Sequence, residues 1–169
     1  MKKLNFLLIA LVLSASTVMA GNKAKDDEAK KDIVDLAVGT EMLSTLVKAV
    51  QQGDLVKTLK SDGPFTVFAP TNEAFAALPD GVLQKLLMPE NKDKLQAILT
   101  YHVVAGAITS GNLSDGQMAE TVQGSEIKVN KNYGKVKINE AQVLKADIEA
   151  SNGVVHVIDK VILPPNFKL

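Results

Sequence analysis

A change in hydrophobic periodicity near the middle of the chain is the feature that most restricts its fold. Before Tyr101, apolar residues recur every three or four positions, as at Leu43, Leu46 and Val50. This is the spacing of amphipathic helices. After Tyr101, apolar residues alternate with charged ones at every second position, the spacing of strands with one face in water. Helices followed by antiparallel strands predict an α+β domain.

The helical half is divided into short segments. Thr40, Asp54 and Thr71 stand where N-cap side chains accept the first backbone amides of a helix. The spacing predicts helices over residues 33–37, 40–53, 54–59, 71–78, 82–87 and 91–100. One strand interrupts them at 65–68, where β-branched and aromatic residues run up to Pro70, which ends it.

The second half predicts a hairpin. Ile127 and Val129 alternate with Glu126 and Lys128, a second alternating run covers 135–138, and the turn falls at 131–134. One face of this hairpin carries lysines and is expected to face water. A further extended segment is expected over 143–148. An apolar run over 154–163 predicts a central strand, ended by two prolines at 164–165.

The N-terminus predicts export. Residues 1–20 consist of a short basic start, an apolar stretch from Phe6 to Leu13 and a small-residue segment ending at Ala20, the order of a cleavable signal peptide. Serines and a threonine interrupt the apolar stretch too early for a membrane anchor. Residues 21–31 are polar and are expected to be a flexible leader, residues 32–165 one domain, and 166–169 a short tail.

Composition excludes several classes of function. The chain has no cysteine, which removes thiolate metal sites and thiol nucleophiles. All 19 basic residues are lysines, and they balance 19 acidic residues. Without arginine, the chain lacks the planar group that recognises phosphates and guanines, so we expect no nucleic-acid partner.

Three segments together resemble the fasciclin domain. They are TVFAPTNEAF at 66–75, Tyr101-His102, and NGVVHVID at 152–159. In this order and at these separations they are similar to the two signature boxes and the central Tyr-His pair of that family. The likeness covers residues 32–165.

The resemblance implies a compact wedge of antiparallel β-strands with several short helices, in secreted or surface-attached proteins that mediate adhesion and matrix contacts. In animal relatives, the Tyr-His pair and an Asp-Ile pair before the second box are implicated in receptor binding. The matching residues here are Tyr101, His102, Asp147 and Ile148. We expect Tyr101 to be half-buried with its hydroxyl at the surface, Asp147 to be exposed and Ile148 to lie in the core.

No catalytic, cofactor or metal site is expected. His102 and His156 both stand in apolar contexts that resemble strands, which predicts buried rings with satisfied hydrogen bonds. His156 and Asp159 are three apart and would point to opposite faces of a strand, which argues against a hydrolase triad. The acidic residues 26–28 lack the spacing of a calcium loop and are expected to be solvated.

The sequence therefore favours an exported, non-enzymatic binding or adhesion module in the periplasm, at the cell surface or in the extracellular matrix. Its partner would be an extracellular or envelope protein or a matrix component, with weak self-association left open. The alternative is a carrier of an apolar, pigment-like small molecule in a cleft of the same fold. An enzyme of unknown class is the third hypothesis.

Overall fold

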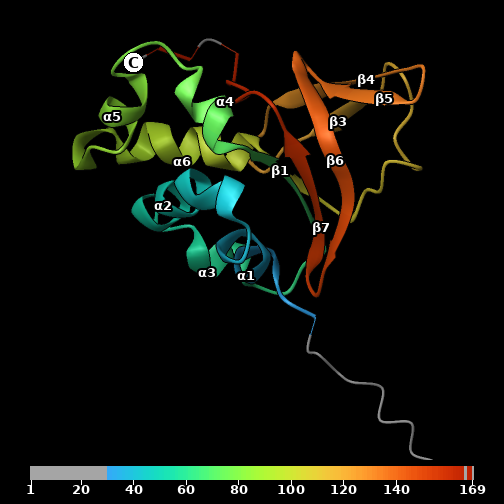
Figure 1. Ribbon diagram of the computed structural model, residues 1–169, viewed down its shortest axis with the longest axis horizontal. Helices are drawn as coiled ribbons and strands as arrows, with labels where there is room; N and C mark the ends of the chain where they lie inside the picture. Colours follow the sequence, from blue (N-terminus) through green and yellow to red (C-terminus); the bar gives the residue numbers. More distant parts are fainter. Residues whose placement is uncertain (1–29, 166, 169) are drawn as a thin grey trace, which may run out of the picture.

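The computed structural model describes residues 30–165, 167 and 168 (Figure 1). The predicted signal peptide, nearly all of the predicted leader and part of the predicted tail lie outside the described residues. Asp32, where the domain is predicted to begin, is the N-cap of the first helix. Within the described ranges, no helix is long and apolar enough to cross a membrane.

The helices of the described part lie in the N-terminal half, as predicted. They are α1 (Ile33–Val38), η1 (Glu41–Leu43), α2 (Ser44–Gln52), α3 (Val56–Leu59), α4 (Asn72–Ala76), α5 (Val82–Leu86), η2 (Pro89–Asn91) and α6 (Lys92–Tyr101). Figure 1 shows these helices gathered on one side of strands β1 and β7. Each is too short to be stable alone, so tertiary packing must stabilise it.

Of the three predicted N-cap residues, the structure confirms Thr71 and contradicts Thr40 and Asp54. Thr71 does cap α4, since its hydroxyl accepts a hydrogen bond from the Ala74 amide at 3.2 Å. Thr40 does not cap, because the chain makes a 3-10 turn after it and its hydroxyl donates to the Leu36 carbonyl at 2.7 Å. Asp54 has a left-handed backbone (φ 60°) and its carboxylate pairs with Lys92 at 2.9 Å instead.

Seven strands form one sheet in the order β2-β1-β7-β6-β5-β4-β3. They are β1 (Phe65–Pro70), β2 (Val103–Ala105), β3 (Met118–Glu120), β4 (Glu126–Asn132), β5 (Lys135–Ile138), β6 (Ala141–Ala150) and β7 (Gly153–Ile158). The β4–β5 hairpin is present as predicted, whereas β2 and β3, with three residues each, are too short to show a periodicity.

The predicted α+β fold is confirmed, and within the mostly antiparallel sheet one pair of strands runs parallel. β1 and β7 run parallel in register from Phe65 beside Gly153 to Pro70 beside Ile158. The other strand pairs in the sheet are antiparallel. Parallel pairing needs a long connection, and most of the domain lies between these two strands in the sequence. Both are buried along nearly their whole length, as central parallel strands usually are.

The far end of the sheet curls back towards its beginning. Val104 of β2 and Thr121, just after β3, form an antiparallel bridge, and the Val122 amide donates to the Val103 carbonyl at 2.8 Å. The strands therefore almost enclose a space on the face away from the helices. β7 itself ends at Ile158 and not at 163, because Asp159 turns its carboxylate back to accept from the Gln142 amide at 2.7 Å.

Two hydrophobic cores lie on opposite sides of β1 and β7. Val67 of β1 and Val155 of β7 face the first core, which they share with the helices. Phe68 and Ile158 face the second core, which the curled sheet encloses. Because neighbouring residues of a strand point to opposite faces, each central strand contributes to both cores.

Candidate functional site

Tyr101 is a core residue. It ends α6 and is 2% exposed. Its hydroxyl donates to the Glu126 carbonyl at 3.1 Å and accepts from the Asn139 side-chain amide at 3.0 Å. The expectation of a half-buried ring with a solvated hydroxyl is wrong, because the strand half supplies both hydrogen-bond partners internally.

His102 is buried with both ring nitrogens engaged. It is the C-cap of α6, not a strand residue as expected. Its Nδ1 lies 2.8 Å from the Ile98 carbonyl, and its Nε2 accepts from the Ile162 amide at 3.1 Å, which together assign the proton to Nδ1. Burial lowers the pKa of His102 to about 4, and the hydrogen bond to Ile98 opposes this only in part. The ring is therefore neutral at physiological pH.

Asp147 lies in an irregular part of β6 and has a left-handed backbone (φ 57°). Its exposed carboxylate accepts hydrogen bonds from the Ser110 hydroxyl and from the Ser110 amide, the latter at 2.6 Å. These two hydrogen bonds hold the pKa of Asp147 below its usual value. The neighbouring Ile148 is partly buried and packs against the first core.

His156 is likewise a structural residue. It is 1% exposed and stacks on Phe68 with ring centroids 5.5 Å apart. Its Nε2 lies 2.8 Å from the Ile108 carbonyl, and its Nδ1 accepts from the Asp147 amide at 3.2 Å. The Ser110 hydroxyl donates to a carboxylate and not to this imidazole, so the three side chains do not make a nucleophilic triad.

The four residues implied by the resemblance do not form one exposed surface. Tyr101 packs in the second core and Ile148 against the first. His102 is buried between α6 and the segment after β7. Of the four, only Asp147 has an exposed side chain. Across the described part of the chain, no group of three His, Asp or Glu side chains could hold a metal ion.

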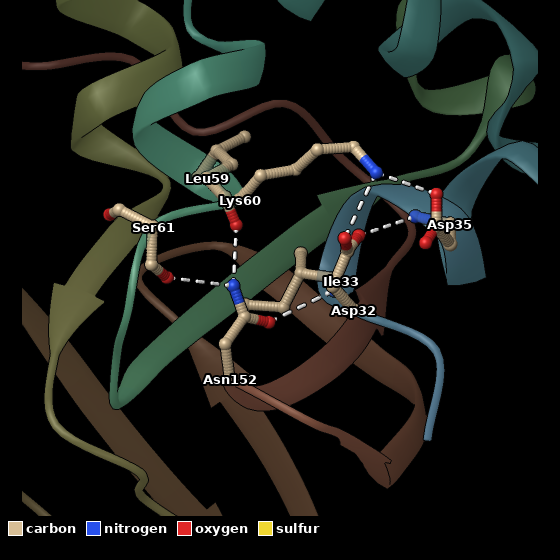
Figure 2. Close-up of polar contacts among 7 residues, drawn as sticks. All are labelled: Asp32, Ile33, Asp35, Leu59, Lys60, Ser61 and Asn152. Atoms are coloured by element: carbon tan, nitrogen blue, oxygen red, sulfur yellow. Dashed lines mark hydrogen bonds and ion pairs between the residues drawn. The ribbon is translucent and has the colours of Figure 1, made fainter. Parts of the chain in front are cut away.

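The sequence reasoning missed the role of Asn152, which joins three segments (Figure 2). Its side-chain amide donates to the carbonyls of Leu59 at 2.7 Å and Ser61 at 3.1 Å. Its side-chain oxygen accepts from the Ile33 amide at 3.1 Å. One carboxamide thus ties the start of α1 and the end of α3 to the turn before β7, and only long-range contacts could reveal this.

Lys60 adds an ion-pair group beside Asn152 (Figure 2). Its ammonium lies 2.7 Å from Asp35 and 2.9 Å from Asp32. The hydrogen bonds to Asp35 and Asp32 raise the pKa of Lys60. Burial works in the opposite direction for Asp32, but hydrogen bonds from the Asp35 amide and from Lys60 lower its pKa. One ammonium thus bridges two carboxylates where the domain begins.

One apolar cavity lies between the helices and the sheet. It is lined by side chains of α1, α2, α3 and the central strands, among them Val34, Val50, Leu59 and Val155. Its volume is about 30 Å³, room for little more than one water molecule. In this conformation the cavity is an imperfection of packing and not an open ligand site.

The geometry thus defines an α+β domain whose histidines and signature segments are used internally. The fasciclin domain family model matches residues 41–164, and the chain belongs to this family. Protein sll1483 of Synechocystis sp. is 58% identical over 133 residues, which cover 79% of this chain and 73% of that protein.

Two more distant proteins are also similar to this chain. Transforming growth factor-beta-induced protein ig-h3 of Sus scrofa is 42% identical over 133 residues, covering 79% of this chain and 19% of that protein. Among solved structures, a FAS1 domain pair from the insect cell adhesion molecule fasciclin I matches with a TM-score of 0.71 and 23% identity, covering 79% of this chain and 51% of that one. This last likeness concerns the fold alone.

Proposed function

We propose that the chain is an exported, non-enzymatic binding module that acts in adhesion or matrix contact outside the cytoplasm. The observation that carries the proposal is the internal use of both histidines. Each ring has both nitrogens hydrogen-bonded within the domain, so neither is available for acid–base catalysis. A domain of this kind acts through its surface.

Two further observations support the proposal. The chain belongs to the fasciclin domain family, and the resemblance to that family implies adhesion and matrix contacts. Residues 1–20 have the order of a signal peptide, which would deliver the domain to the periplasm, the cell surface or the medium. The partner would be an extracellular or envelope protein or a matrix component.

A deletion strain of the native host tests adhesion and export separately. We expect reduced surface attachment, restored by the full chain but not by a chain lacking residues 2–20, which should stay in the cytoplasm. Crosslinking in the cell envelope should recover a partner only with the exported form. Unchanged attachment in the deletion strain, together with no crosslinked partner, would contradict the proposal.

The receptor-binding residues implied by the resemblance remain a separate proposal. With Tyr101, His102 and Ile148 largely buried, a partner could reach Asp147 directly and the others only through changes in local structure. Asp147→Asn should then weaken crosslinking, whereas an unchanged yield would contradict a role for this carboxylate.

The alternative function, a carrier of an apolar small molecule, has one candidate site in the apolar cavity. Ligand sites for drug-sized molecules measure about 300–1,000 Å³, far more than the cavity's volume of about 30 Å³. A ligand would have to displace α1 or α3 from the sheet. Native mass spectrometry of protein purified from its host tests this alternative, and a ligand-free mass would contradict it.

A further inference from the structure

The outer face of the β4–β5 hairpin forms a polar groove. In Figure 1 this hairpin lies on the other side of strands β6 and β7 from helices α2 and α5. Two cross-strand pairs lie side by side on it, Asn130 with Lys137 and Asn132 with Lys135. Tyr133 lies at the tip of the hairpin. We call this surface the hairpin groove, and its volume is about 720 Å³. The groove is lined by Asn130, Asn132, Tyr133, Lys135, Lys137, Asn139, Glu140 and Lys160.

Tyr133 has no structural reason to be a tyrosine. It is 99% exposed, so its ring contributes almost nothing to packing. Tyr133 and Gly134 both have positive φ, 48° and 76°, in the two-residue turn between the strands. Such turns favour Asn followed by Gly, and a left-handed conformation costs other residues about 1 kcal/mol. A strained and fully exposed aromatic side chain points to a role in binding.

The lysines of the hairpin groove have no carboxylate partner in the part of the chain that the structure describes. No ion pair within 4 Å joins Lys135, Lys137 or Lys160 to an acidic residue of the described ranges, in contrast to Lys60 and Lys92. Glu140 is the one acidic residue lining the groove. The groove therefore has an excess of positive charge on a chain that is neutral as a whole.

Two asparagines add unused hydrogen-bonding groups. The carboxamides of Asn130 and Asn132 make no hydrogen bond to any residue that the structure describes, whereas Asn139 uses its own to bind the Lys128 amide and the Tyr101 hydroxyl. Each free carboxamide offers two donors and an acceptor. Such donors and acceptors can form hydrogen bonds with the hydroxyls of a sugar ring. The face of an aromatic side chain can pack against the C–H groups of the same sugar ring.

We propose that the hairpin groove binds an acidic polysaccharide, with the lysines opposite its carboxylates, the asparagines at its hydroxyls and Tyr133 against a sugar ring. This partner class rests on the proposed function and makes it specific. A membrane surface fits less well, because the groove contains no aliphatic side chain to enter lipid. Nucleic acid fits less well because the chain has no arginine.

The test uses purified full-length chain and two uronic-acid polymers, polygalacturonate and alginate, in affinity electrophoresis. We expect binding that weakens with added salt and that is lost with fully methyl-esterified polygalacturonate, which has the same backbone without the charge. Tyr133→Asn should weaken binding about fivefold, yet leave the unfolding midpoint unchanged or higher, since Asn-Gly suits the turn. This opposite response separates a binding role from a structural one.

Charge is tested with a matched pair of double variants. Lys135→Gln with Lys137→Gln should weaken binding about tenfold. Lys48→Gln with Lys85→Gln removes the same charge from two exposed sites on the helices and should leave binding unchanged.

Three results would overturn the proposal. They are no binding to either polymer, equal binding of the methyl ester, and competition by phosphatidylglycerol vesicles that is sensitive to the same variants, which would indicate a membrane instead. If the full chain restores attachment in the deletion strain but binds neither polymer, the polysaccharide proposal alone fails.

Discussion

Asn152→Ala should be among the most destabilising changes to a polar residue in this domain. The truncation removes the donor to the Leu59 and Ser61 carbonyls and the acceptor of the Ile33 amide. Each lost hydrogen bond costs about 1 kcal/mol, so the free energy of unfolding should fall by about 3 kcal/mol. With a urea m value of about 2 kcal/mol/M, the midpoint should fall by about 1.5 M while m stays constant.

Two further variants make this prediction specific. Asn112 is exposed and its side chain makes no hydrogen bond within the described ranges, so Asn112→Ala should leave the midpoint nearly unchanged. Asn152→Asp keeps the acceptor for the Ile33 amide but places a carboxylate oxygen against two carbonyls. The two carbonyls should raise its pKa above the usual value of about 4, so the loss of stability should be full at pH 7 and should shrink as the pH falls from that raised pKa towards about 4, where the acid becomes a donor.

This prediction would be contradicted if Asn152→Ala shifted the urea midpoint no more than Asn112→Ala. It would also be refuted if Asn152→Asp matched the wild type at pH 7, since a carboxylate cannot donate to either carbonyl.

Three more changes test other parts of the structure. Gly153→Ala should cost more than about 3 kcal/mol in thermal unfolding, because a Cβ there would overlap the Phe65 carbonyl oxygen, whereas a Cβ at Gly111 would make only an ordinary contact with the Thr109 hydroxyl at 3.9 Å, so Gly111→Ala should be neutral. Burial lowers the pKa of His102 to about 4, so as the pH falls the unfolded chain binds the proton before the folded one does. The free energy of unfolding should therefore fall by up to about 3 kcal/mol between about pH 6.5 and about pH 4. His102→Gln should flatten this part of the pH profile, measured by urea titration. Tyr101→Phe should lower the urea-derived stability by about 1–2 kcal/mol, since it removes a hydroxyl with two partners, and should not change polygalacturonate binding.

Local patterns were sufficient to predict much of the fold. The stripe through Leu43, Leu46 and Val50 lies in η1 and α2 as expected, and the alternation around Val129 lies in β4. The predictions that were wrong concern residues whose contacts lie far away in the sequence. Thr40 does not cap a helix, since its hydroxyl donates to the Leu36 carbonyl, and it is Asn72, far along the chain, that accepts from the Thr45 amide of α2 at 2.9 Å. The parallel pairing of β1 with β7 likewise leaves no local sign in either strand.

The candidate site was predictable only in part. The two histidines were expected to be buried and satisfied, and the structure confirms this. The burial of Tyr101 was underestimated because its hydroxyl partners, Glu126 and Asn139, belong to a hairpin whose position over α6 is a tertiary result. The exposure of Tyr133 is equally a tertiary property, since an aromatic residue beside a glycine in a turn has no fixed environment in the sequence.

The residues that stabilise the fold should therefore be different from the residues that bind the partner. In the first signature segment, the Thr66 hydroxyl donates to the Gly106 carbonyl at 2.5 Å and accepts from the Ile108 amide at 2.8 Å, and in the second, Asn152 holds the helices to the sheet. In the hairpin groove, by contrast, the side chains of Asn130, Lys135 and Lys137 make no hydrogen bond to any residue that the structure describes. Asn130→Thr with Lys137→Thr places two strand-favouring residues opposite each other on its outer face and should change the free energy of unfolding by less than about 0.5 kcal/mol. The same double variant should abolish most polysaccharide binding. If it instead destabilised the domain as much as Asn152→Ala does, the hairpin face would be needed for the stability of the fold, and stabilising and binding residues would not be separate.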